Sequence, residues 1–294
     1  MRPDVSIVIP VYNDPEGITT TLESLLSHTE TAEIVVVDND SSDETPDVAG
    51  SYADANEHVS LVFERDVQSS YAARNTGIEH ASCDRLCFLD ADQRVTDDWL
   101  ENALARMDDL EAHYLAPAVE LQLPDDPSPT ARYNYVSGFP IEGFLRRHRY
   151  APTSCLFVTR TLLEDVGRFD DRLVSGGDLE FGNRVYDAGY DLAYAKEATV
   201  VHPTRDSFRS LFDRNVRIGR GHCQLQRYYP DRYGRPGIPP RPSGIRRDQY
   251  DASMNRGLYN AISLTMTAAR GIGYYRECIR LGREWVDERL SSNN

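Results

Sequence analysis

Lysine is almost absent from this sequence of 294 residues. Of its 32 basic residues only Lys196 is a lysine, and 47 acidic residues bring the net charge to −15. An acidic, lysine-poor surface is what a high-salt cytoplasm favours, although acidity alone also serves ordinary solubility. The composition therefore predicts a halophilic protein, and we expect no nucleic-acid partner.

Long apolar runs and cysteine pairs are also missing. No run approaches the roughly 20 apolar residues of a membrane-spanning helix, and Met1 lies too close to the first predicted strand for a signal peptide. The five cysteines show neither a Cys-x-x-Cys pair nor a zinc spacing, which is typical of reduced thiols. We therefore expect a cytoplasmic protein.

Two glycine-rich phosphate-binding loops are absent as well. No Gly-x-Gly-x-x-Gly follows the first predicted strand, which disfavours a dinucleotide-binding oxidoreductase. The loop Gly-x-x-x-x-Gly-Lys-Ser/Thr does not occur either.

The charge is unevenly distributed along the chain. Residues 205–294 contain 17 arginines and 9 acidic residues, a balance of +8, so residues 1–204 carry −23. We predict one domain over residues 1–204 and a basic, mainly helical extension over 205–294. A basic extension on an acidic body suggests an anionic partner for the extension.

Apolar runs alternate with helical patterns through the first part of the chain. Short runs rich in β-branched residues, typical of buried strands, alternate with stretches of helical periodicity. This order predicts an α/β fold with a mainly parallel sheet and right-handed crossovers. The predicted strands are 5–10, 33–37, 59–63 and 86–89. The predicted helices between them are 16–27, one that Ser42 or Asp43 caps and that runs through Tyr52, and 69–81.

The later segments are less regular. Residues 125–138, rich in proline, acid and tyrosine, are predicted to be a mobile connection. One or two short strands are expected over residues 192–201, and two helices over about 252–270 and 273–290.

Two carboxylates follow the buried run at residues 86–89. Asp90 and Asp92 would point to the same side if the strand continued through them, and two acids so close repel unless a cation lies between them. Carboxylates suit Mg²⁺ or Mn²⁺, which in turn bind phosphate oxygens. A polar turn after a strand is the simpler alternative. The first two strands also end in polar or aromatic groups, at residues 10–13 and 38–40, which favours a ligand site at one sheet edge.

A third carboxylate follows a pair of glycines. Asp178 comes after Gly176 and Gly177 and is predicted at the N-cap of a helix, where capping alone would explain it. His202 follows a late strand, and a lone histidine is more often a core or surface residue than a ligand.

Taken together, these motifs resemble family 2 glycosyltransferases of the GT-A fold over about residues 4–221. The motifs are weak singly and specific jointly. They are residues 6–13 (SIVIPVYN), 37–43 (VDNDSSD), 73–77 (ARNTG), 88–92 (FLDAD) and 176–180 (GGDLE).

The resemblance implies a role for each matched residue. Tyr12 would pack beside the nucleotide base, Asp38 would hydrogen-bond it, and Asp178 would be the general base. Asp92 would hold Mn²⁺ or Mg²⁺, with His202 as a further contact. The implied nucleotide-sugar-binding residues are Pro10, Tyr12, Asp38, Arg74 and Asp90, and the implied metal-binding residues are Asp92, Asp90 and His202.

Two departures from the family pattern affect these expectations. Gly177 stands where the family often has glutamate before the base, so Glu180 remains an alternative to Asp178. Residues 224–228 (QLQRY) faintly resemble the Gln-x-x-Arg-Trp signature of processive synthases, but tyrosine replaces tryptophan. We therefore expect addition of a single sugar.

The expected function is metal-dependent, inverting transfer of a sugar from a nucleotide-diphosphate sugar, with UDP-sugars favoured, to a hydroxyl. A lipid-linked saccharide in glycoprotein or cell-surface glycan assembly is one expected acceptor, with the basic extension on the cytoplasmic face of a membrane. The alternatives are a non-catalytic nucleotide-sugar or glycan-binding subunit and a sugar-phosphate nucleotidyltransferase.

Overall fold

The computed structural model describes residues 4–28, 32–240 and 254–291, with side chains described as far as residue 283. The chain divides into two compact units. Unit 1 comprises Met1–Gln122, Phe139–Arg172 and Gly177–Pro203. Unit 2 comprises Leu123–Gly138, Leu173–Gly176 and Thr204–Asn294.

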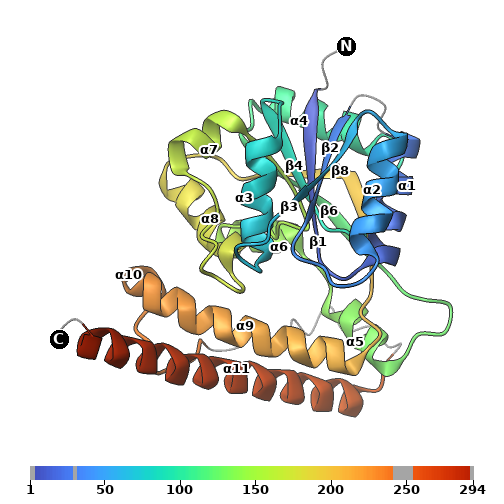
Figure 1. Ribbon diagram of the computed structural model, residues 1–294. Coiled ribbons are helices and arrows are strands. Elements are labelled where there is room, and N and C mark those ends of the chain that lie inside the picture. Colours follow the sequence, from blue (N-terminus) through green and yellow to red (C-terminus); the bar gives the residue numbers. More distant parts are fainter. Residues whose placement is uncertain (1–3, 29–31, 241–253, 292–294) are drawn as a thin grey trace. The chain divides into compact units, whose positions relative to one another are not determined.

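Unit 1 is built on one mixed, mostly parallel sheet (Figure 1), with the strand order β3-β2-β1-β4-β7-β6-β8-β5. The pairs β1–β2, β2–β3, β1–β4 and β6–β8 are parallel, whereas β4–β7, β6–β7 and β5–β8 are antiparallel. The strands are β1 Val5–Val11, β2 Ala32–Asp38, β3 Val59–Phe63, β4 Arg85–Leu89, β5 Arg94–Val95, β6 Tyr114–Gln122, β7 Cys155–Thr159 and β8 Ala193–Pro203.

Helices flank the sheet of unit 1 (Figure 1), as the predicted α/β class requires. Apolar side chains of both layers, including Ile7, Leu22 and Trp99, are almost completely buried. The helices are α1 Pro15–His28, α2 Thr45–Ala55, α3 Ser70–His80, α4 Trp99–Asp109, α6 Ile141–His148, α7 Arg160–Val166 and α8 Gly177–Asp187. The expected α/β architecture is therefore confirmed.

Helix α3 lies directly against strand β1. A Cβ atom added at Gly77 would lie 2.2 Å from Cγ1 of Val8, so only glycine allows this approach. The helix begins after Ser69, whose hydroxyl accepts the backbone N–H of Tyr71. This packing fixes the first turns of α3, which carry Tyr71 and Arg74, relative to the sheet.

Unit 2 is helical. Its elements are α5 Pro129–Ser137, α9 Phe208–Tyr228, α10 Pro230–Tyr233 and α11 Arg256–Ser291. Apolar residues of α9 and α11 form a buried cluster that includes Leu211, Ile262 and Met266. The two backbones also approach closely at two glycines. A Cβ atom on Gly219 would lie 1.9 Å from the carbonyl oxygen of Arg270, and one on Gly273 would lie 2.0 Å from that of Val216.

A buried ionic group also connects the two long helices of unit 2. Glu277 on α11 accepts hydrogen bonds from Arg220 (3.0 Å) and Gln224 (2.8 Å) on α9. Arg280, one turn further along α11, donates to the same carboxylate. Burial raises the pKa of Glu277, but the arginine hydrogen bonds and charges outweigh it and hold the pKa below its usual value.

Several local predictions were wrong. Residues 125–138 are not simply a connection, because Ser128 accepts the N–H groups of Thr130 and Ala131 and so begins α5. The two helices predicted over 252–290 are the single helix α11 in the described part of that range. The predicted end of strand β4 at Leu89 is confirmed, so the strand does not continue through the two aspartates. Helix α8 begins at Gly177, which places Asp178 in the first turn and not at the N-cap.

Candidate functional site

The carboxyl ends of β1, β2 and β4 meet at one edge of the sheet of unit 1. Val11 pairs with Asp38 at the ends of β1 and β2, and β4 runs parallel to β1 on its other side. The loops that follow β1 and β2 are bonded together, since Asn13 accepts the N–H of Ser42 at 2.8 Å. The structure therefore brings the three predicted strand-end segments to one edge, as the sequence predicts.

Asp38 carries an unsatisfied oxygen at this edge. The residue is 1% exposed, and its Oδ1 accepts the N–H of Ser41 at 3.0 Å. Its Oδ2 is buried and has no hydrogen-bond partner among the described residues. A buried carboxylate oxygen without a donor is unfavourable, so this atom suits a hydrogen bond from a ligand. The ring of Tyr12, the next residue after β1, is half exposed.

Arg74, which is buried, forms an ion pair with Asp90, which is partly exposed. The guanidinium of Arg74 lies 2.8 Å from Oδ1 of Asp90, and it also donates to the carbonyl oxygen of Ser70 at 3.2 Å. The contact connects α3 to the loop that follows β4. Asp90 and Asp92 thus have different neighbours, since Asp90 pairs with Arg74 and Asp92 faces His202.

The side chains of His202 and Asp92 face each other. Nε2 of His202 is 3.7 Å from Oδ1 of Asp92. Nδ1 of His202 lies 2.9 Å from the carbonyl oxygen of Pro203, and this geometry places the proton on Nδ1. In the part of the chain that the structure describes, no group of three or more His, Cys, Asp or Glu side chains gathers around a common point. The protein therefore offers an ion two donor atoms here.

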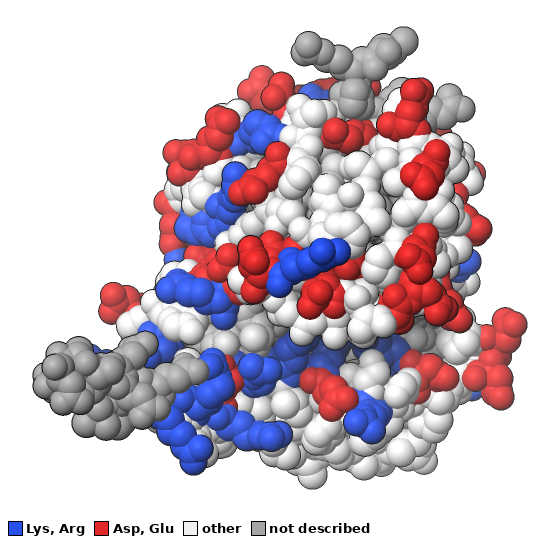
Figure 2. Space-filling view, in the orientation of Figure 1, with Lys and Arg blue, Asp and Glu red and all other residues white. Residues whose placement is uncertain are grey.

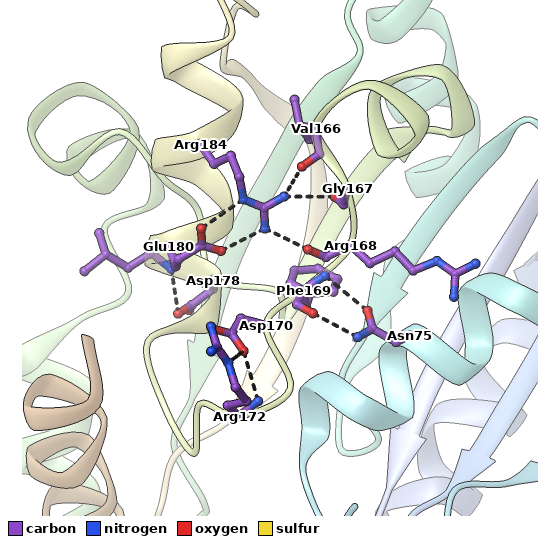
Figure 3. Close-up of polar contacts among 11 residues, drawn as sticks. Asn75, Val166, Gly167, Arg168, Phe169, Asp170, Arg172, Asp178, Glu180 and Arg184 are labelled. Atoms are coloured by element: carbon purple, nitrogen blue, oxygen red, sulfur yellow. Dashed lines mark hydrogen bonds and ion pairs between the residues drawn. The ribbon is translucent and has the colours of Figure 1, made fainter. Parts of the chain in front are cut away.

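Helix α8 presents two carboxylates in different surroundings (Figure 3). Glu180 is 5% exposed, and Arg184 donates to both of its oxygens, at 2.9 Å to Oε1 and 2.8 Å to Oε2. Asp178 is less buried. Its Oδ1 accepts the N–H of Leu179 at 2.9 Å and lies 3.5 Å from the hydroxyl of Tyr71.

Arg184 also contacts the last residue of α7 and the segment that follows this helix (Figure 3). Its guanidinium donates to the carbonyl oxygens of Val166, Gly167 (3.1 Å) and Arg168 (2.7 Å). The side chain of Asn75 on α3 bonds both backbone groups of the following residue, Phe169, at 3.1 and 2.9 Å. The segment of residues 166–169 is thereby fixed to α3 on one side and to α8 on the other.

Sequence reasoning missed two side chains that contact the carboxylates of α8, namely Tyr71 beside Asp178 and Arg184 beside Glu180. The spacing of Glu180 and Arg184, four residues apart on one helix, was a readable signal for an ion pair. Tyr71 gave no comparable signal, because its contact with Asp178 joins residues 107 positions apart.

Comparison with known proteins identifies the family of the chain. Residues 6–162, more than half of the chain, match the model of "Glycosyl transferase family 2". This chain belongs to glycosyl transferase family 2. The resemblance seen in the sequence is confirmed, and the protein is a glycosyltransferase enzyme.

Two relatives illustrate how far the family likeness extends. Glycosyltransferase AglE of Haloferax volcanii is 35% identical to this family 2 glycosyltransferase over 226 residues, 76% of this chain and 74% of AglE. The pre-mycofactocin glycosyltransferase of Mycobacterium tuberculosis is 29% identical over 238 residues. That match covers 78% of this chain but spans only 49% of the mycobacterial protein.

Solved structures support the GT-A fold. The mannosyltransferase PcManGT from Pyrobaculum calidifontis, in complex with GDP-Man and Mn²⁺, matches 100% of this chain and 80% of its own, with a TM-score of 0.59 at 18% identity. S. aureus TarS 1–349 in complex with UDP-GlcNAc matches 73% of this chain and 66% of its own, with a TM-score of 0.53 at 19% identity. Among the helices described for this glycosyltransferase, none combines the length and apolarity needed to cross a membrane.

Proposed function

We propose that this glycosyltransferase is a metal-dependent, inverting enzyme that transfers one sugar from a nucleotide-diphosphate sugar to a hydroxyl, with Asp178 as the general base. The observation that carries the proposal is the difference between the two carboxylates of α8. Both oxygens of Glu180 accept hydrogen bonds from Arg184. Glu180 therefore has a structural partner in place, which favours Asp178 for proton transfer.

The chemistry follows from these positions. Asp178 accepts the proton of the acceptor hydroxyl as the oxygen of that hydroxyl forms a bond with the anomeric carbon. The bond from that carbon to the diphosphate breaks on the opposite side, so the configuration at the anomeric carbon inverts. Arg74, held by Asp90 at 2.8 Å, keeps positive charge near the diphosphate side.

Asp92 and His202 fit a divalent ion. A metal-binding histidine commonly donates its second ring N–H to a carbonyl oxygen, and His202 has this arrangement with Pro203. Its Nε2 then faces Oδ1 of Asp92 at 3.7 Å, and carboxylate with imidazole suits Mn²⁺, while Mg²⁺ is the alternative. When bound, the ion would neutralise charge that develops on the leaving diphosphate.

Asp38 and Tyr12 suit the nucleotide base. The unpaired Oδ2 of Asp38 can accept an N–H from the edge of a base, and the half-exposed ring of Tyr12 can pack on its face. We propose a UDP-sugar as donor. The two solved structures of similar fold described above contain GDP-Man and UDP-GlcNAc, so direct comparison of GDP with UDP by calorimetry tests this choice. Tighter binding of GDP would reverse it.

The proposed acceptor is a lipid-linked saccharide, reached from an anionic membrane surface. Helix α11 buries Ile262 and Met266 against α9 but exposes apolar side chains on its other face. Leu264 is 71% exposed and Ile279 is 58% exposed, and Ile272 and Tyr275 lie between them at helical spacing. Such a face can lie in the interfacial region of a bilayer.

Arginines of unit 2 support the same proposal. Figure 2 shows basic side chains gathered over α9 and α11. The exposed arginines of these helices include Arg209, Arg217 and Arg227 of α9 and Arg276 of α11. Each basic residue near an anionic surface adds roughly 1 kcal/mol at modest salt. Molar salt shortens the Debye length to about 3 Å, so under such conditions the apolar side chains must contribute more of the attachment.

The catalytic proposal is tested by paired substitutions. Asp178→Asn should lower kcat on the order of 10²-fold or more while nucleotide-sugar binding remains, because the base acts on the acceptor. Glu180→Gln, the matched variant on the same helix, should show a smaller decrease in kcat. Asp92→Asn should also abolish transfer. If Asp178→Asn is active and Glu180→Gln is inactive, Asp178 is not the base. Full activity of Asp92→Asn in EDTA would refute the metal site.

The membrane proposal is tested on the full chain with Leu264→Gln and Ile279→Gln combined. Both side chains are highly exposed, so folding should be unaffected. The unaltered protein should float with vesicles of anionic archaeal-type lipid, and the double variant should not. If both stay with the unbound fraction, and only water-soluble acceptors are used, the membrane proposal fails while the catalytic proposal stands.

A further inference from the structure

Tyr71 lies in a closely fitted position beside Asp178. Its side chain is 6% exposed, and its hydroxyl is 3.5 Å from Oδ1 of Asp178. A Cβ atom on Gly177 would come within 2.8 Å of the tyrosine ring. The ring therefore occupies the space that any side chain at position 177 would need.

The surroundings hold this ring in place. The ring of Phe169 stacks on Tyr71 with centroids 6.0 Å apart, and the guanidinium carbon of Arg74 lies 5.9 Å from the centre of the Tyr71 ring. Phe169 is itself fixed through both backbone groups by Asn75. Packing of this kind fixes the direction in which the Tyr71 hydroxyl points.

We propose that Tyr71 is a positioning residue for the catalytic base. Gly177 is then required because the ring of Tyr71 occupies the space that a side chain at position 177 would fill. The hydroxyl of Tyr71 and the N–H of Leu179 both point their hydrogen-bond donors at Oδ1 of Asp178. Two donors on one oxygen set the rotation of the carboxylate and favour its charged form. The inference rests on the proposed role of Asp178 as the base.

The separation of 3.5 Å is long for a hydrogen bond between a hydroxyl and a carboxylate. Hydrogen bonds at catalytic groups are often long without substrate and tighten in the complex. The packing around Tyr71 limits the adjustment to a small one. The alternative is that Tyr71 only fills space, in which case its hydroxyl is dispensable.

Tyr71→Phe removes the hydroxyl and keeps the ring. Loss of a hydrogen bond to a charged group should lower kcat about tenfold, with an unchanged KM for the nucleotide sugar. The acidic limb of the kcat profile should move to higher pH, because the charged carboxylate loses a donor. Tyr190→Phe is the matched control, since Tyr190 donates to Asp165 at 3.0 Å elsewhere in unit 1; it should behave as the unaltered enzyme.

Gly177→Ala tests the same geometry from the other side. The added methyl group should displace the ring and lower kcat to a similar extent. Because both changes remove one interaction, the double variant Tyr71→Phe/Gly177→Ala should be no slower than Gly177→Ala alone. Circular dichroism and nucleotide-sugar binding establish that each variant is folded.

Three outcomes separate the possibilities. Unchanged kcat and pH profile in Tyr71→Phe, or losses that multiply in the double variant, would overturn the role of Tyr71. If Tyr71→Phe behaves like the unaltered enzyme while Asp178→Asn is inactive, only the inference fails. An active Asp178→Asn would instead overturn the proposed base itself.

Discussion

Among the residues that the structure describes, two glutamates are buried beside arginines, one in each unit, and their partners connect different elements. Glu180 pairs with Arg184 on its own helix, and Arg184 continues to the carbonyl oxygens of residues 166–168. Glu277 is 2% exposed and receives Arg220 and Gln224 from α9, more than 50 positions away in the sequence.

The comparison indicates that similar ion pairs serve different ends. The pair in unit 1 connects α8 to the carbonyl oxygens of residues 166–168. The group in unit 2 joins two helices, so the stability of the helical unit depends on it. Removing one partner of a buried pair is costly because the other is left without compensation, but the consequence should appear as lost activity in unit 1 and as unfolding in unit 2.

The largest effect is expected for Glu277→Ala. The change leaves Arg220, Arg280 and Gln224 without their shared acceptor and should lower the free energy of unfolding by about 3 kcal/mol. Urea unfolding measures the loss. Asp213→Ala is the control, because its pair with Arg209 lies on the surface of α9 and should contribute less than about 0.5 kcal/mol. Equal losses in the two variants would refute the distinction.

Acid should weaken unit 2 through His222 on α9. Burial, assisted by the charge of Arg270, lowers the pKa of His222 to about 4. The unfolded chain therefore binds a proton between about pH 6.5 and pH 4 that the folded chain does not. Stability is fully present above pH 6.5 and falls on acidification, by up to about 3 kcal/mol.

Hydrogen exchange in α9 and α11 should accelerate between pH 7 and pH 4.5 beyond the intrinsic change in rate, and His222→Gln should remove most of this acceleration. Glu277 acts at lower pH, since a lowered pKa gives stability that is present above its unfolded value and lost below it. Exchange in α9 of the unaltered chain that follows the intrinsic rate throughout would contradict the role of His222.

A smaller effect, and one on activity, is expected for Arg184→Lys. Lysine keeps the charge but cannot reach Glu180 and the carbonyl oxygens of residues 166–168 together. We expect kcat to fall about tenfold while unfolding changes by only about 1 kcal/mol. Arg220→Lys in unit 2 is the counterpart, and it should lower stability with kcat unchanged. The reverse pattern would show that the two pairs do not differ as described.

The smallest effect concerns salt. The acidic balance of −23 in residues 1–204, against +8 in residues 205–294, leads us to expect that molar KCl screens repulsion and raises stability by about 1 kcal/mol. Thermal unfolding in dilute buffer and in molar KCl measures this increase in stability. A melting temperature that falls with added KCl would count against a halophilic protein.

The sheet edge of unit 1 could be predicted because its signals are local. Runs of valine and isoleucine indicate strands, and parallel strands bring their following loops to one edge. The positions of the motifs alone therefore predict that Tyr12, Asp38 and Asp90 lie in the same region. Their contacts could not be predicted in the same way, because the pairing of Arg74 with Asp90 depends on how closely α3 approaches β1 at Gly77.

Other features depended on contacts distant in sequence. The sequence was divided into two helices at about residues 270–273, but in the described residues α11 continues through Gly273, where the backbone of Val216 lies too close for a side chain. The partner of Tyr71 could not be found from sequence for a similar reason. Local patterns report which element a residue belongs to, whereas partners are set by the packing of whole elements.

The reciprocal glycines of unit 2 also determine what can change during evolution. Gly219 lies against the backbone of Arg270, and Gly273 lies against the backbone of Val216. Because each glycine leaves room for one position of the other helix, α9 and α11 cannot shift by a turn relative to each other. Their alignment is therefore independent of the length of the chain between them. Insertions and deletions in that connection should accumulate among homologues. Any larger residue at either glycine would push α9 and α11 apart and should be selected against.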